Sequence, residues 1–75
     1  MTAREMFIDV NMKKVYEDDR ILRYEDFLTR EFYVIFYKKE KMFEAFTNYD
    51  CVITIRELQA INKQIEELGW NNVKD

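Results

Sequence analysis

The chain has 75 residues, of which 48% are hydrophobic and 16% aromatic, and its formal net charge is -3. A chain this short is expected to form one domain, 1–75, with a marginal core, since it buries only about 60% of its unfolded surface. One cysteine excludes an internal disulfide, and the lack of histidine excludes the usual zinc-ligand patterns. We therefore expect no metal or cofactor, and we expect oligomerisation, most simply a homodimer, to supply stability.

The charged residues are interleaved along the chain and do not form a basic stripe, so nucleic acid is an unfavoured partner. The longest apolar run, residues 32–37, is too short to cross a bilayer. The first residues lack the charged-then-apolar order of a signal peptide, and one free cysteine suits a reducing compartment. These features predict a cytoplasmic protein without a membrane segment.

The first predicted element is a short helix over residues 2–10. Thr2 and Glu5 have the spacing of a capping box, in which each residue's side chain accepts from the other's backbone N–H. The apolar residues that follow share one helical stripe: Ala3, Met6, Phe7 and Val10. Asn11 tolerates left-handed backbone geometry, so the helix is expected to end beside it.

Four strands are predicted next, over residues 13–17, 20–25, 31–38 and 41–47. Asp18 and Asp19 form the turn of the first hairpin, and a charged segment, residues 38–41, connects the last two strands. Residues 26–30 fit either a loop or a single turn that buries Phe27 and Leu28. The third strand is apolar on both faces, which favours a central position in the sheet.

The last predicted element is a capped amphipathic helix over residues 54–68. Thr54 and Glu57 form a second capping box, and Gly69 is placed to end the helix in the left-handed conformation. Trp70 could then fold back on Ile65. The expected apolar stripe has four members: Leu58, Ile61, Ile65 and Leu68.

This order predicts an α+β fold, with an antiparallel sheet of about four strands and both helices on one sheet face, because each helix has only one apolar stripe to bury. The opposite face would carry aromatic residues in either register. Candidates for that face are Tyr24, Tyr33, Ile35, Tyr37 and Phe43.

The two ends of the chain resemble a group of small uncharacterised proteins encoded by phages and prophages of Gram-positive bacteria. Residues 2–7 follow the pattern Thr-Ala-(Arg/Lys)-x-Met-Phe, and residues 57–70 follow Glu-Leu-x-Ala-Ile-Asn-Lys-Gln-x-x-Glu-Leu-Gly-Trp. Residues 10–12 depart from the group, whose members often have a Leu-Gly-Tyr-like turn there. The resemblance implies a phage origin and the host cytoplasm as the setting, and it implies no activity or catalytic residue.

Several residues allow a chemical and a structural interpretation. Cys51 could be a nucleophile, but without a histidine base a small buried residue is favoured. The carboxylates at 17–19 could bind a cation, and the lysines at 38, 39 and 41 could contact phosphate, but solvated hairpin turns are favoured for both. Glu44 could face a groove, although a solvated position is favoured. The aromatic third strand could stack on nucleic-acid bases, yet core packing or self-association suits an acidic chain better.

The sequence therefore predicts a non-enzymatic phage accessory protein that acts as a protein-interaction module, and a more specific version of this prediction is inhibition of a host factor in counter-defence. The alternative is a small-ligand protein that binds a nucleotide-like molecule at a dimer interface. No catalytic or metal-binding residue is predicted. The candidate interaction surface comprises Tyr24, Tyr33, Ile35, Tyr37, Phe43, Arg56, Lys63 and Glu67.

Overall fold

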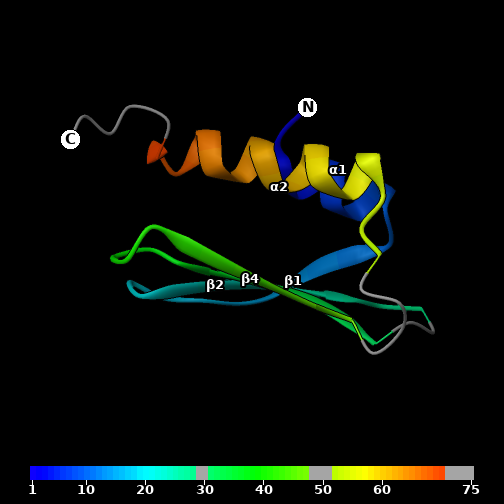
Figure 1. The fold of residues 1–75 in the computed structure, drawn as a ribbon, viewed down its shortest axis with the longest axis horizontal. Coiled ribbons are helices and arrows are strands. Elements are labelled where there is room, and N and C mark those ends of the chain that lie inside the picture. The colour runs from blue at the N-terminus through cyan, green and yellow to red at the C-terminus, as the bar shows by residue number, and fades with distance from the viewer. Residues whose placement is uncertain (29–30, 48–51, 71–75) are drawn as a thin grey trace.

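The protein is a two-layer α+β structure, as predicted (Figure 1). The computed structural model describes residues 1–28, 31–47 and 52–70. Its elements, each within one residue of the expected bounds, are α1 (Ala3–Asp9), β1 (Met12–Glu17), β2 (Ile21–Asp26), β3 (Phe32–Tyr37), β4 (Met42–Thr47) and α2 (Ile55–Glu67). The antiparallel sheet has the order β1-β2-β3-β4, and both helices lie on one of its faces.

Both helices begin at the predicted capping boxes. The Thr2 hydroxyl accepts from the Glu5 N–H at 3.2 Å, and the Glu5 carboxylate accepts from the Thr2 N–H at 2.7 Å. Thr54 and Glu57 make the same pair of bonds at 3.1 and 2.9 Å. These bonds satisfy N–H groups that have no partner inside the helix, so they fix where each helix starts.

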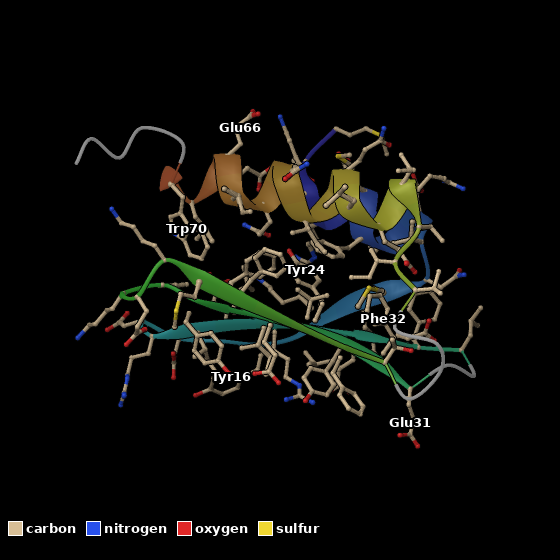
Figure 2. The ribbon with its side chains drawn as sticks, viewed as in Figure 1. Tyr16, Tyr24, Glu31, Phe32, Glu66 and Trp70 are labelled. Atoms are coloured by element: carbon tan, nitrogen blue, oxygen red, sulfur yellow. The ribbon has the colours of Figure 1, made fainter. Side chains whose placement is uncertain are left out.

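The ends of the helices also follow the sequence. Asn11 has a φ of 70° after α1, and Gly69 has a φ of 80° after α2, so both adopt the left-handed conformation expected of them. Trp70 then turns back over the sheet, and its ring meets that of Phe36 at a centroid distance of 6.1 Å. The C-terminal end of α2 is thereby held above β3 (Figure 2).

The predicted apolar stripe of α2 is confirmed at three of its four positions, because Ile61 is buried and Ile65 and Leu68 pack against the core. Leu58 is 42% exposed, whereas Ala60 and Ile61 are buried together with two polar residues, Glu57 and Gln64. The polar residues tolerate burial because Glu57 caps Thr54 and Gln64 accepts a hydrogen bond from a core tyrosine. The buried face of α2 is therefore wider than the predicted stripe, because it also includes Glu57, Ala60 and Gln64.

The core lies between the helices and the inner face of the sheet. Phe7 of α1 stacks on Tyr24 of β2 with ring centroids 3.9 Å apart, and Phe36 of β3 meets both rings edge-on at 6.4 Å. The Tyr24 hydroxyl donates to the Gln64 side-chain oxygen at 2.6 Å. The completely buried cluster comprises Phe7, Met12, Leu22, Tyr24, Phe32, Val34, Phe36, Ala60 and Ile61.

The first hairpin differs from a regular ladder. Lys14 pairs with Tyr24 but Tyr16 pairs with Arg23, so Val15 is a bulge in β1. Met12, which the sequence had left outside the strand, opens β1 and is completely buried.

The loop between β2 and β3 leaves its apolar side chains in solvent. Phe27 and Leu28 are both exposed, so the alternative of a turn that buries them is wrong. The Asp26 carboxylate accepts from the Leu28 N–H at 2.8 Å as the loop leaves β2. The predicted loop at 48–50, Cys51 and the tail 71–75 lie outside the described residues.

Candidate interaction surface

The helices cover one face of the sheet, and the opposite face carries a second set of aromatic residues. Strand residues alternate between faces, so the neighbours of Leu22, Tyr24, Val34 and Phe36 point away from the helices. Figure 2 shows Tyr24, Phe32 and Trp70 between the layers, and Tyr16 on the far side of the sheet. We call this far side the outer face; it comprises Lys13, Tyr16, Ile21, Arg23, Glu25, Tyr33, Ile35, Tyr37, Met42, Glu44 and Phe46.

The centre of the outer face is apolar and is enclosed by polar side chains. Ile35 lies between Arg23 of β2 and Glu44 of β4 in the strand register, and only 9% of its surface is exposed. The Tyr37 and Tyr33 hydroxyls both donate to the Glu44 carboxylate, at 2.9 and 3.2 Å. One carboxylate therefore holds two tyrosine rings in fixed positions on either side of Ile35.

These hydrogen bonds change the acidity of the two tyrosines. The bond to the Glu44 carboxylate raises the pKa of Tyr37. Partial removal from solvent raises the pKa of Tyr33, and the bond to Glu44 adds to this effect. Both hydroxyls therefore stay protonated at neutral pH and act as donors.

A row of stacked groups crosses three strands of the outer face. The Arg23 guanidinium carbon lies 4.3 Å from the centre of the Tyr33 ring. The Tyr33 ring also stacks on the Phe46 ring, with the two centroids 5.1 Å apart. Arg23 is also held by Glu25, with Nε 2.6 Å from a carboxylate oxygen. The row is thus fixed by a cation–π contact, an aromatic stack and an ion pair.

A shallow hollow opens beside this row. Its volume is about 330 Å³, and Arg23, Tyr33 and Phe46 form its aromatic and cationic wall. Its rim is acidic, with the carboxylates of Glu25, Asp26 and Glu31. The Tyr33 ring is already covered by Arg23 and stacked on Phe46, so a cationic group that entered the hollow would be attracted chiefly by the three carboxylates.

The predicted surface residues divide between the two faces of the sheet. Tyr33, Ile35 and Tyr37 do lie together on the outer face. Tyr24 is on the inner face, where it is 2% exposed and bonded to Gln64. Phe43 is also on the inner side, with its ring 6.0 Å from that of Phe36, although it lies in an edge strand and remains partly exposed.

The three helix residues of the predicted surface lie on α2, on the other layer of the molecule. The Glu67 carboxylate accepts from the Ala3 N–H at 2.7 Å, so it ties α2 to the first turn of α1. Lys63 pairs with Glu66 at 3.1 Å, and Arg56 is exposed beside α1. These residues do not join the outer face, and Glu67 has an evident structural role.

Sequence reasoning missed Arg23 and Phe46 as members of the outer face. Phe46 could have been found from its spacing, because it shares a strand face with Glu44. Arg23 could not, because its position over Tyr33 depends on the register between β2 and β3.

The charged residues near the first hairpin pair mainly with one another. Lys14 and Lys38 both contact the Glu17 carboxylate, at 2.8 and 2.9 Å, and this lowers the pKa of Glu17. Lys38 also donates to the Asp18 carbonyl at 2.8 Å. The Asp18 carboxylate accepts from Tyr16, Arg20 and Ile21, which lowers its pKa to about 2.

This cluster is therefore a hairpin clasp made of Lys14, Glu17, Asp18 and Lys38. Within residues 1–28, 31–47 and 52–70, no group of acidic or cysteine side chains is arranged to hold a metal ion. Within the same residues, neither helix is long and apolar enough to span a bilayer.

Comparison with known protein families, curated proteins and solved structures finds no match to this chain. The outer face is consequently interpreted from its own geometry.

Proposed function

We propose that the protein is a non-enzymatic interaction module whose outer face binds a partner protein. The observation that carries this proposal is the fixed row of Arg23, Tyr33 and Phe46 on the sheet face opposite α1 and α2. Tyrosine, phenylalanine and arginine are the residues that contribute most to protein interfaces when they are held rigidly. The row is already ordered, so binding would cost little side-chain entropy.

The chemistry of the outer face supports binding more than catalysis. Its polar groups are engaged with each other, since Glu44 accepts from Tyr33 and Tyr37 while Arg23 pairs with Glu25. The face therefore offers shape, aromatic area and an acidic rim. A partner with an exposed lysine or arginine among apolar residues would complement all three.

The resemblance of the chain ends to phage proteins gives this module a proposed setting. In that setting it is a phage accessory protein in the host cytoplasm, a homodimer, and an inhibitor of a host factor in counter-defence. Small chains with marginal cores gain stability from association, which is the physical reason to expect the homodimer.

Affinity capture from a lysate of a Gram-positive host tests this proposal when it is done with matched variants. The double variant Tyr33→Ala/Phe46→Ala removes the aromatic row, and Ile55→Ala removes an exposed apolar side chain from α2. The wild type and Ile55→Ala should retain the same host protein in equimolar amounts, and the double variant should lose it. Equal capture by all three proteins, each shown to be folded by circular dichroism, would reject the outer face as the binding surface.

The hollow beside Tyr33 favours a second candidate function. Its volume of about 330 Å³ is at the small end of ligand sites, and its aromatic residues would suit the flat base of a nucleotide-like molecule at a dimer interface, whereas its three carboxylates would disfavour the phosphate groups. Thermal-shift measurements with a panel of nucleotides test this candidate, because a ligand at a hundred times its dissociation constant adds about 2.7 kcal/mol of stability. If no nucleotide raises the melting temperature, this candidate is rejected.

A further inference from the structure

The two edges of the sheet differ in how well they are protected against pairing with another strand. β1 carries Lys13 and Lys14 and is interrupted by the bulge at Val15. Lysines and bulges are the devices by which natural edge strands resist further pairing. The β1 edge is therefore a poor template for a new strand.

β4 has none of these devices along its length. It pairs with β3 through an unbroken register from Met42 to Thr47, it contains no lysine, and Glu44 is its only charged residue. Among residues 1–28, 31–47 and 52–70 the sheet order ends at β4, so no other described strand pairs with the side of β4 that faces away from β3. Its exposed apolar side chains are Met42 at 56%, Phe43 at 42% and Phe46 at 43%.

The helix layer also exposes an apolar side chain. The side of α2 that lines the recesses beside α1 carries Arg56, Gln59 and Lys63. Helical spacing places Leu58 on a different side of α2. α1 packs on β1 and on α2, so the side of α2 away from α1 is the side toward β4. Leu58 is an exposed apolar residue on α2.

We propose that β4 pairs antiparallel with β4 of a second copy of this chain, with Ala45 opposite Ala45, to form one continuous sheet across a twofold axis. This inference rests on the proposed interaction role and assigns the homodimer contact within it. The contact lies along the strand edge, so the outer faces of both copies remain available and become one larger surface.

The charge on β4 selects this register. Residues that face each other across antiparallel strands point to the same side, so a symmetric pair must be centred on a residue. Centring on Glu44 would place two carboxylates directly opposite, which is unfavourable. Centring on Phe46 would overlap less of the strand. Centring on Ala45 places Glu44 opposite Phe46 of the second copy, so no like charges meet.

A disulfide test reads the register directly. In a Cys51→Ala background, which removes the only native cysteine, Ala45→Cys places two thiols opposite each other across the proposed axis. Mild oxidation should convert most of this variant to a covalent dimer. Val15→Cys, on the β1 edge, is the matched control and should remain monomeric after oxidation. If Ala45→Cys links no faster than Val15→Cys, the proposed pairing is wrong.

A charge test does not depend on cysteine chemistry. Phe46→Glu would place a carboxylate opposite Glu44 of the second copy, whereas Phe46→Lys would place an ammonium group there, and both variants lose the same stack on Tyr33. In sedimentation equilibrium, the dimer dissociation constant of Phe46→Glu should exceed that of Phe46→Lys by about tenfold. Equal constants for the two variants, or a wild type that stays monomeric at every concentration, would overturn the proposal.

The outcome is separable from that of the capture experiment. A monomeric wild type that still retains a host protein through Tyr33 and Phe46 would remove the β4 pairing and leave the interaction role. A dimer of the proposed register that captures no host protein would support the β4 pairing and reject the interaction role.

Discussion

The two faces of one sheet use the same residue types for different purposes. On the inner face, Tyr24 is buried between Phe7 and Phe36, and its hydroxyl is bonded to a buried amide of α2. On the outer face, Tyr33 and Tyr37 are only half-buried, and their hydroxyls share one exposed carboxylate. The inner face is thus fixed by burial, and the outer face is fixed by hydrogen bonds and stacking among its own side chains.

An aromatic residue in a small sheet therefore cannot be assigned to core or surface from its type alone. The helices exclude water from the inner face, so loss of the packing on that face should unfold the protein. The outer face keeps its order without such a cover, which makes it available for a partner.

The largest difference is expected between two phenylalanines. Phe36 is completely buried, and Phe36→Ala should lower the free energy of unfolding by about 3–5 kcal/mol. That is a large share of the stability of a domain this small. Phe46→Ala on the outer face removes a half-exposed ring and its stack on Tyr33, so it should cost about 1 kcal/mol. Urea denaturation measures both, and equal losses would show that the outer face is part of the core.

The next difference is between two tyrosine hydroxyls. Tyr24→Phe removes the donor to the Gln64 oxygen, which is buried, and should cost about 1–3 kcal/mol. Tyr37→Phe removes a hydroxyl that water can replace at Glu44, so its effect on urea denaturation should be much smaller. The comparison fails if Tyr37→Phe destabilises the protein as much as Tyr24→Phe does.

A smaller effect is expected in the acidity of the tyrosines when Glu44 is changed to Gln. The Glu44 hydrogen bond is the main cause of the raised pKa of Tyr37 and a secondary cause for Tyr33, so both values should fall. The pKa of Tyr24 is raised to about 12 mainly by burial, so it should not change. Ultraviolet titration of tyrosinate, with Tyr24→Phe as the control that removes the highest transition, separates these groups. A fall in the Tyr24 transition would contradict the independence of the faces.

The smallest effect is expected at the hairpin clasp, which belongs to neither face. Hydrogen bonds from Tyr16, Ile21 and Arg20 lower the pKa of Asp18 from 3.8 to about 2. A lowered pKa means that the folded state prefers the ionised form, so this stabilisation is present above about pH 4 and is lost as the pH falls toward about 2. Asp18→Asn should therefore lower the melting temperature at pH 7 and have progressively less effect toward pH 2.

Asp19→Asn changes the net charge equally and serves as the control for that measurement. A difference between Asp18→Asn and the wild type that stays constant from pH 7 to pH 2 would contradict the role given to the Asp18 carboxylate.

Local features of the sequence were enough to predict the elements and their ends. The capping boxes at Thr2 and Thr54, the left-handed residues Asn11 and Gly69, and the apolar character of β3 all act within a few residues of themselves. Because these effects are local, the sequence around each residue is enough to predict them. The α+β architecture followed because two amphipathic helices need one sheet face.

The assignment of side chains to faces could not be predicted. β3 is apolar at every position, so alternation gives no sign of which residues meet the helices, and Tyr24 and Tyr33 looked equivalent. The burial of Gln64 on α2 could not be predicted either, because it depends on the hydrogen bond from Tyr24, 40 residues away in the sequence. The bulge at Val15 likewise depends on the pairing of β1 with β2. Each of these features is set by long-range contacts.

The most direct test of the outer face as an interaction surface is a parallel measurement of stability and binding for Tyr33→Ala/Phe46→Ala. Urea denaturation should show a folded protein with a cooperative transition, and affinity capture should show that the host protein retained by the wild type is lost. The opposite result, in which the folded double variant retains that protein as well as the wild type does, would contradict the account.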